Sequence, residues 1–429
     1  MSAMVMPLLH ADPVFPQRDF LLDPGAVAER IGCGIGINAA VKVEHCERVR
    51  ATYRAGQSLR VLYKLRAEGE IFMLAARAFP EGADGQRFAR QFPPAAEGAT
   101  FHPVFGDLEN HTVFWTFPND RKIANLPLLM SVPQCLSDLL NSRWTHSRLA
   151  AYAPEKCATV QCLDDQQNVL AYAKVYAGHD GRGCYKTYND FAQNRMANSR
   201  QFSTPRAIAY SDSFQILLLE PIHGKRIADL EPEELERGFN YLGRALASFH
   251  AMPIGAGLPR FTRLDARHLQ EAAGIIGLVR PDVAVLAQEL CDSLCGAASG
   301  ISDRSVYLHG DVHPKNGILR DQGVVMIDLD QAGSGPAAAD LGSLLAALRY
   351  EVVTGSLSEI SESRLIRAFL SGYSVGNELP HPAALRWFTA AALFAERALR
   401  AVSRVRTEGL EHLRELLLAA RNLSEKAYV

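Results

Sequence analysis

Three polar side chains follow one another at short spacing in residues ~305–345, between segments that are otherwise apolar. They are Asp311, Asn316 five positions later, and Asp328 at the end of a strand-like run. Phosphoryl transfer needs such groups, because a carboxylate must orient the acceptor hydroxyl and oxygen ligands must hold Mg²⁺ on the nucleotide phosphates. Asp311 suits the role of base, and Asn316 and Asp328 suit the metal.

A hairpin turn predicted at 320–323 would bring Asp328 back beside Asn316. His309 and His313 flank Asp311, so a hydrolytic metal centre is an alternative. The spacing offers no further histidine or carboxylate partners for such a centre, which favours structural roles for both histidines.

The sequence of this stretch resembles that of a known family. Residues 309–316 read His-Gly-Asp-Val-His-Pro-Lys-Asn, and 327–330 read Ile-Asp-Leu-Asp. This is similar to the aminoglycoside phosphotransferase and choline kinase superfamily, which has the protein-kinase-like fold. Segments 242–251 and 335–342 also fit that family, and the resemblance covers roughly residues 145–429.

The resemblance implies a role for each residue of the motif. Asp311 would be the catalytic base, and Asn316 and Asp328 would bind Mg²⁺. His309 would brace the loop rather than react, and Asp330 is either an additional acidic contributor or a surface residue. Asp340, further downstream, is expected to anchor the loop structurally.

The resemblance also implies a nucleotide site. Lys174 stands mid-strand where the family places the lysine that contacts ATP phosphates, although a lone strand lysine is usually an exposed residue. Residues 218–222 resemble the hinge, whose backbone groups at Glu220 and Ile222 would pair with the adenine edge.

Two features of the family pattern are missing. No Glu lies between Lys174 and Glu220 to pair with the strand lysine, and Asp190 is the one substitute considered. The segment 152–157, Tyr-Ala-Pro-Glu-Lys-Cys, contains no glycine where a phosphate loop would lie. Both departures keep a kinase-like regulator without catalysis in consideration.

The order of predicted elements gives an α+β fold. Strand-like segments are expected over 47–65, 70–79, 112–117, 149–163 and 170–176, with turns at 68–69 and 164–168 and a loop over 83–100. Helices are expected near 131–150, 184–198, 233–252, 281–298, 359–373, 382–405 and 408–427. We expect a protein-kinase-like two-lobe fold, with a β-rich N-lobe (141–230) and a helical C-lobe (231–429), preceded by an N-terminal α+β domain (1–140).

The N-terminal domain resembles the N-lobe that follows it. Ala76-Arg77-Ala78-Phe79 aligns with Ala173-Lys174-Val175-Tyr176, and residues 122–126 align with 226–230 in the same order. We hypothesise that residues ~45–130 duplicate the β-rich lobe at ~148–230, the alternative being chance similarity. The extra domain would be noncatalytic and would cap the acceptor site, rigidify the kinase lobe or form an oligomer interface.

Composition excludes some classes of protein. Lys and Arg total 45 against 47 Asp and Glu, so the basic excess typical of nucleic-acid binding is absent. No long apolar run predicts a membrane span, and the first residues make a poor signal peptide, so a cytoplasmic location is expected. The eight cysteines form no Cys-x-x-Cys pair and are interpreted as small buried residues in a reducing compartment.

The sequence therefore predicts an ATP- and Mg²⁺-dependent transfer of the γ-phosphoryl group to a hydroxyl of a small molecule. Sugars, aminoglycosides and amino alcohols are all acceptable acceptors. A sugar or saccharide is slightly preferred, because relatives that phosphorylate sugars can carry an extra N-terminal domain. The alternative is a nucleotide-binding pseudokinase that acts through a partner. No motif is readable near 255–300 and 350–385, where acceptor specificity is expected, and the oligomeric state is not indicated.

Overall fold

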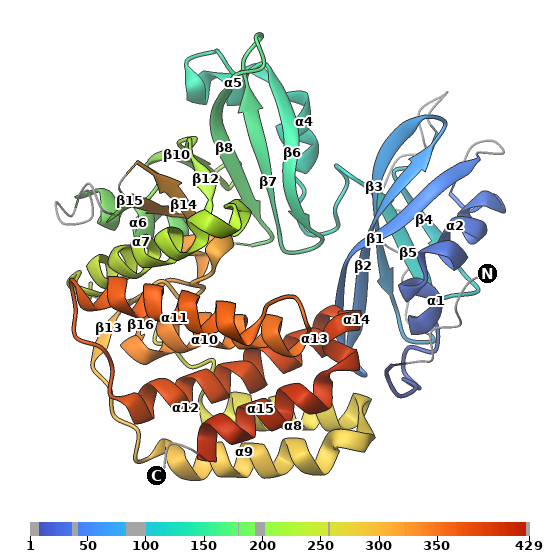
Figure 1. Ribbon diagram of the computed structural model, residues 1–429. Coiled ribbons are helices and arrows are strands. Elements are labelled where there is room, and N and C mark those ends of the chain that lie inside the picture. Colours follow the sequence, from blue (N-terminus) through green and yellow to red (C-terminus); the bar gives the residue numbers. More distant parts are fainter. Residues whose placement is uncertain are drawn as a thin grey trace. The chain divides into compact units, whose positions relative to one another are not determined.

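The computed structural model describes residues 8–36, 42–82, 100–178, 180–193, 202–255, 258–321 and 323–425 (Figure 1). The chain forms two compact units. The first comprises Met1–Arg182, Ile208–Leu219 and Ser403–Val405, and the second comprises Gly183–Ala207, Glu220–Val402 and Arg406–Val429.

The first unit begins with an antiparallel sheet, shown in blue to cyan in Figure 1. Its described strands are β1 (Val43–Arg54), β2 (Ser58–Ala67), β3 (Glu70–Ala78), β4 (Val104–Asp107) and β5 (Thr112–Thr116), in the order β1-β2-β3-β5-β4. The predicted turn at Glu68 and Gly69 joins β2 to β3, and both residues have positive φ, as a tight hairpin turn requires. Residues 83–99 of the predicted loop lie outside the described residues.

Two short helices cover one face of this sheet, and the sequence analysis did not predict them. They are α1 (Arg18–Leu22) and α2 (Pro24–Gly32). The Asp23 side chain accepts hydrogen bonds from the backbone N–H groups of Gly25 and Ala26 at the start of α2. An aspartate followed by proline is a helix-start signal that was available in the sequence.

A second sheet in the same unit contains β6 (His146–Ala153), β7 (Cys157–Leu163), β8 (Val169–Tyr176), β10 (Ala207–Ser211) and β11 (Ile216–Leu219). Its order is β10-β11-β8-β7-β6. The helices α4 (Leu126–Ser131) and α5 (Gln134–Ser137) precede it. The helix predicted over 131–150 was therefore too long, because β6 already begins at His146.

The two sheets have the same topology. Counted from its own first strand, each runs first, second, third, fifth, fourth. The first hairpin closes alike in both, with Gln57 N–H donating to Arg54 O at 2.9 Å and Lys156 N–H donating to Ala153 O at 3.0 Å. A register shift also interrupts the pairing of the first two strands in each sheet. The duplication hypothesis required equal strand orders, and they are equal.

One apolar cluster contains side chains from both sheets of the first unit. Leu62 and Trp115 come from the N-terminal sheet, and Val160 and Leu218 come from the second. The Trp115 indole N–H donates to the Tyr152 hydroxyl at 2.9 Å, so the buried polar atom of the tryptophan is satisfied. The two sheets therefore fold around a shared core.

The second unit is mainly helical (Figure 1). Its helices are α7 (Pro232–His250), α8 (Ala266–Val279), α9 (Ala284–Ala298), α10 (Ala337–Val353), α11 (Glu359–Ser374), α12 (Pro382–Ala392), α13 (Leu399–Arg404), α14 (Thr407–Glu411) and α15 (Leu413–Glu425), and most of α6 (Asp180–Gln193) belongs here. Short strands are β9 (Phe202–Ser203), β12 (Lys225–Arg226), β13 (Ser305–Leu308), β14 (Gly317–Arg320), β15 (Gly323–Met326) and β16 (Gly333–Pro336). The sequence analysis missed α8.

Helices α7 and α11 approach each other closely through glycine. A Cβ atom on Gly243 would lie 2.1 Å from Phe369 O, and one on Gly372 would lie 2.0 Å from Asn240 O. Only glycine permits this distance between backbones. The crossing brings Tyr373 beside His250 at the end of α7, where the centroids of the two rings are 5.6 Å apart.

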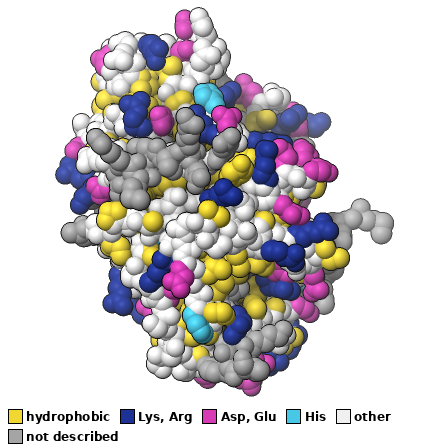
Figure 2. Space-filling model, turned by 60° about the vertical axis from the view of Figure 1, so that its left-hand side comes forward, with side chains coloured by type: hydrophobic (Ala, Val, Ile, Leu, Met, Phe, Trp, Pro, Cys, Tyr) yellow, Lys and Arg dark blue, Asp and Glu magenta, His cyan; other side chains and the backbone are white. Residues whose placement is uncertain are grey.

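The surface mixes both charge signs, and acidic and basic side chains are interspersed on the face drawn in Figure 2. Within the described ranges, no helix combines the length and the apolar character needed to cross a membrane. The cysteines are free. Cys162, Cys184 and Cys291 are buried as predicted, whereas Cys33 and Cys135 are exposed, so the prediction of burial was wrong for those two.

Candidate active site

The loop that follows β13 is held by hydrogen bonds to one carboxylate. Asp340, in the first turn of α10, accepts hydrogen bonds from the backbone N–H of His309 at 2.7 Å and of Gly310 at 2.9 Å. Gly310 has φ +79°, and a Cβ atom there would lie 2.0 Å from Gln331 O, so no other residue fits. The two residues that precede Asp311 are therefore held in place.

Asp340 itself is buried and held by a further chain of hydrogen bonds. His250 Nε2 lies 3.1 Å from Asp340 Oδ2, and His250 Nδ1 lies 2.8 Å from the Tyr373 hydroxyl. Burial raises the pKa of the Asp340 carboxyl, but the hydrogen bond from His250 and the bonds from the loop outweigh burial and lower it. Asp340 therefore stays ionised and acts as the structural anchor that the sequence suggested.

His309 connects the loop to the segment that carries Asp328. Its buried ring accepts a hydrogen bond from Asp311 N–H on Nδ1 at 3.3 Å, so Nε2 carries the proton and donates to Ile327 O at 3.1 Å. Both ring nitrogens are occupied. The ring is therefore suited to hold the loop in place, and it has no free lone pair for a metal ion.

Asn316 lies against Asp311 and against the same segment. Its Nδ2 donates to Asp311 O at 3.0 Å and approaches Asp311 Oδ2 at 3.4 Å. Its backbone oxygen accepts from Ile327 N–H at 2.9 Å. The predicted hairpin of β14 and β15 thus brings Asp311, Asn316 and the residue before Asp328 together.

Asp328 follows β15 with φ 66° and ψ 62°, a left-handed conformation that is uncommon for a residue with a side chain. Strain of this kind is concentrated at functional sites. Asp330 is exposed, and one of its carboxylate oxygens accepts from the Cys184 thiol at 3.5 Å. Leu329 N–H donates to the Tyr188 hydroxyl at 3.4 Å, so α6 contacts this segment twice.

His313 is a structural residue by its contacts. Its Nδ1 accepts from Lys315 N–H at 3.2 Å and caps the single turn Pro314–Asn316. Burial and, to a smaller extent, the positive charge of Arg397 lower its pKa to about 4. The ring is therefore neutral near pH 7, and its Nδ1 is occupied by the bond from Lys315 N–H.

Two protein oxygens could serve a divalent cation here. They are a carboxylate oxygen of Asp328 and Oδ1 of Asn316, whose amide nitrogen faces Asp311. No group of three or more His, Cys, Asp or Glu side chains suited to a metal ion occurs in the described parts of the chain. Mg²⁺ needs no such cage, because it typically takes one or two protein ligands and completes its shell with phosphate oxygens and water. The donor set therefore fits Mg²⁺ on a nucleotide.

Lys174 lies in β8 of the first unit and is 9% exposed. The interpretation as an ordinary exposed strand lysine is therefore wrong. Its Nζ lies 5.6 Å from the centroid of the Tyr176 ring, on the opposite face of the sheet from the buried Ala173 and Val175. A lysine is buried to this degree only when it has partners for its charge.

The residues expected to form the hinge directly follow β11, where the segment Glu220–Val402 of the second unit begins. Glu220 N–H donates to Arg206 O at 3.0 Å, and the Glu220 carboxylate accepts from Arg206 N–H at 2.9 Å. Among the described residues, neither the Glu220 carbonyl nor the Ile222 N–H has a backbone partner. Asp190, the considered substitute for a helix Glu, is exposed on α6.

Three residues beside the loop were missed by the sequence analysis. Arg263 donates to Gly310 O and lies 3.5 Å from Glu396 Oε1. Arg397 is buried and donates to Ser343 O at 3.0 Å. Glu396 and Arg397 belong to a π-helical turn, Leu393–Ala398, a feature that often marks functional sites. They are distant in sequence from Asp311, so no local motif could have indicated them.

Residues 190–388 match the model of the phosphotransferase enzyme family. This match covers less than half of the chain, so the segment is similar to that family, and a long N-terminal extension precedes it. The matched segment contains Asp311, Asn316 and Asp328 and leaves residues 1–189 outside. None of the curated proteins matches the chain.

Several solved structures are similar to the chain at low identity. Spectinomycin phosphotransferase APH(9)-Ia, in complex with ADP and spectinomycin, is 13% identical, covers 68% of this chain and 98% of its own, and has a TM-score of 0.47. A choline/ethanolamine kinase family protein from Mesorhizobium loti is 13% identical, with 70% and 93% covered and a TM-score of 0.47. Macrolide 2'-phosphotransferase from Brachybacterium faecium is 15% identical, with 70% and 97% covered and a TM-score of 0.45.

Proposed function

We propose that this kinase transfers the γ-phosphoryl group of ATP to a hydroxyl of a small molecule, with a sugar or saccharide preferred as acceptor. The observation that carries the proposal is the hydrogen-bonded arrangement of Asp311, Asn316 and the residue before Asp328. It holds the half-buried carboxylate of Asp311 beside Asn316 and ties Asn316 to the segment that carries Asp328, so these residues would supply the base and the metal ligands that phosphoryl transfer requires.

In this mechanism Asp311 orients the acceptor hydroxyl and accepts its proton as the new O–P bond forms, while the bond between the γ-phosphorus and the bridging oxygen breaks and ADP leaves. Asn316 and Asp328 would hold Mg²⁺, which when bound neutralises charge on the nucleotide phosphates. His309 keeps the base and the metal ligands in one geometry through its bonds to Asp311 N–H and Ile327 O. Lys174 would neutralise a phosphate, and the Glu220 carbonyl and Ile222 N–H would pair with adenine.

The preference for a sugar draws on polar groups that contact the loop at Gly310. Arg263 and Glu396 are close to each other and to the loop, and one carboxylate oxygen of Glu396 is buried without a hydrogen bond among the described residues. Hydroxyl groups are suited to satisfy such a site, because each can donate to the carboxylate and accept from the guanidinium. Aminoglycosides and amino alcohols carry the same hydroxyls and remain in the acceptor panel.

The duplicated N-lobe belongs to this proposal. The equal strand orders, the matching first hairpin and a shared turn support it. In that turn Leu126 N–H donates to Ile123 O at 3.3 Å, and Leu230 N–H donates to Ile227 O at 3.4 Å. Residues 1–140 would be the noncatalytic copy, 141–230 the nucleotide lobe and 231–429 the acceptor lobe. Arg77 occupies the position in β3 that Lys174 occupies in β8.

A regulator that binds nucleotide without catalysis is the second candidate. It is favoured by Glu155, a buried carboxylate in the turn where a phosphate loop would lie. ATP consumption that requires Asp311 distinguishes the two candidates, because a binding protein has no use for a proton acceptor. ATP binding without turnover for any acceptor would favour the regulator.

A further inference from the structure

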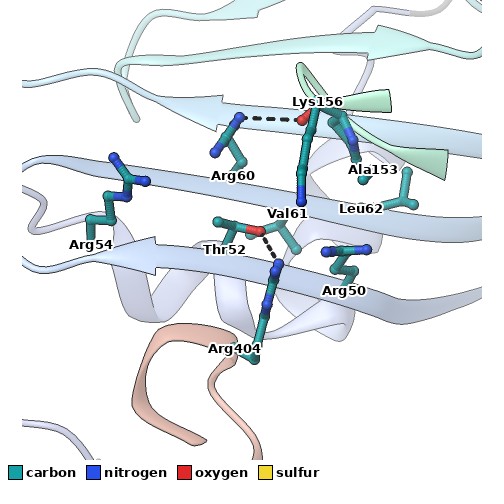
Figure 3. A pocket seen from close by; sticks show the side chains of 10 residues that line it. Arg50, Thr52, Arg54, Arg60, Val61, Leu62, Ala153, Lys156 and Arg404 are labelled. Atoms are coloured by element: carbon teal, nitrogen blue, oxygen red, sulfur yellow. Dashed lines mark hydrogen bonds between the residues drawn. The ribbon is translucent and has the colours of Figure 1, made fainter. Parts of the chain in front are cut away.

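A small cavity of about 180 Å³ lies inside the first unit, between the N-terminal sheet and the turn that joins β6 to β7 (Figure 3). Its lining residues are Arg50, Thr52, Arg54, Arg60, Val61, Leu62, Ala153, Pro154, Lys156 and Arg404. In Figure 3 Lys156 extends from its turn toward β2, and Arg404 reaches Thr52 with a hydrogen bond of 2.7 Å. The cavity is therefore lined by strands β1 and β2, by the turn between β6 and β7, and by Arg404.

The lining is strongly cationic. Five of its ten residues are Arg or Lys and none is acidic, whereas the whole chain has a net charge of -2. The carboxylate of Glu155, the residue between Pro154 and Lys156, is buried and contacts Arg60, Arg77 and Arg121. Glu155 is therefore shared among three guanidinium groups, one of which, that of Arg60, lines the cavity.

The register of the sheet concentrates this charge. Arg60 in β2 stands directly opposite Arg77 in β3, and like charges at such positions repel. The pKa of Arg60 is lowered, mainly by burial and further by the charges of Arg77 and Arg54. The Nε atoms of Arg60 and Arg77 are buried, and neither has a hydrogen-bond partner in the part of the chain that the structure describes.

We propose that this cavity is a binding site for a small phosphorylated anion. Arginine guanidinium groups match phosphate oxygens in geometry and donate paired hydrogen bonds to them. The volume lies below the ~300–1,000 Å³ typical of drug-sized ligands, so one or two phosphoryl groups fit better than a whole nucleotide. All the lining residues belong to the first unit, whereas Asp311, Asn316 and Asp328 belong to the second.

The test is a calorimetric titration of the full chain with inorganic pyrophosphate at low salt in the presence of EDTA, which removes metal-dependent phosphate binding. We expect saturable binding of one pyrophosphate per chain that weakens as ionic strength rises. Arg54→Glu and Lys156→Glu should each weaken it by about tenfold or more, the loss expected for one charge-assisted hydrogen bond. Both side chains belong to exposed residues, so neither variant threatens folding.

Lys64→Glu is the matched control, because Lys64 is exposed on β2, does not line the cavity and changes the net charge equally. It should bind pyrophosphate like the unmodified chain, and so should Asp328→Asn. Parallel titrations with orthophosphate, a sugar phosphate and the same sugar without phosphate separate an inorganic occupant from a phosphorylated metabolite. Absence of saturable binding, equal weakening by Lys64→Glu, or loss of binding in Asp328→Asn would overturn the proposal.

Discussion

The Nε2 atom of His309 lies 3.1 Å from the carbonyl oxygen of Ile327, the residue before Asp328. The same ring accepts the N–H of Asp311 on its other nitrogen. One buried imidazole therefore fixes the distance between the proposed base and the proposed metal ligand.

Replacement of His309 tests this positioning role. His309→Ala should lower kcat by about 100-fold, because a displacement of ~1 Å in a reacting group has an effect of that size, while KM for ATP changes less. His268→Ala, at a histidine of α8 whose side chain is 40% exposed, should leave kcat unchanged. Equal kcat values in the two variants would contradict the role of His309.

Asp340 should control stability at acid pH. Its folded pKa lies below the ordinary value of 3.8, so its contribution is fully present above that value and is lost as pH falls through the folded pKa. Asp340→Ala should lower the free energy of unfolding by about 3 kcal/mol near pH 7, since two loop N–H groups lose their acceptor. The difference from the unmodified protein should shrink below pH 4 in thermal melts, and a pH-independent difference would contradict this account.

Glu155 should be essential to the packing of the two sheets in the first unit. Its buried side chain contacts Arg60, Arg77 and Arg121. Glu155→Gln should lower the free energy of unfolding by about 3 to 5 kcal/mol, the usual effect of leaving buried charges without their partner. Asp165→Asn, in the exposed turn between β7 and β8, is the control and should melt like the parent. Similar melting of the two variants would exclude the role.

The sequence predicted the hairpin that brings the segments of Asp311 and Asp328 together, but it did not predict the residues that surround them. Asp311, Asn316 and Asp328 could be related because one hairpin joins them, and their types are dictated by the chemistry. Arg263, Glu396 and Glu155 could not be found in this way. Each acts through contacts between elements that are far apart in sequence, and a single charged residue at a helix or turn carries no periodic signal.

The strand pattern was predictable for a similar reason. Alternating apolar residues identified most strands, and the short hairpins fixed their neighbours. The helix α8 was missed between two loop-like segments, although Asp265 accepts a hydrogen bond from His268 N–H at its start. The sequence singled out Lys174 as a candidate, but its burial is determined by tertiary packing and could not be predicted.

Nucleotide binding should be limited to one of the two similar sheets. Calorimetry with Mg²⁺ and ATP should give one site per chain. Lys174→Ala should weaken ATP binding by about tenfold, because it removes a positive charge that would neutralise the phosphates. Lys64→Ala, at an exposed lysine of β2, is the control. Two equivalent sites, or unchanged affinity in Lys174→Ala, would contradict the assignment of 141–230 as the nucleotide lobe.

The most direct test measures ATP consumption with Mg²⁺ against sugars, aminoglycosides and amino alcohols, using the full chain and Asp311→Asn. We predict turnover with one acceptor class, with sugars favoured, and a loss of about 100- to 10,000-fold in kcat in the variant, the range typical of a positioned acid or base. Equal turnover in Asp311→Asn and in the unmodified protein would contradict the central claim that Asp311 is the base.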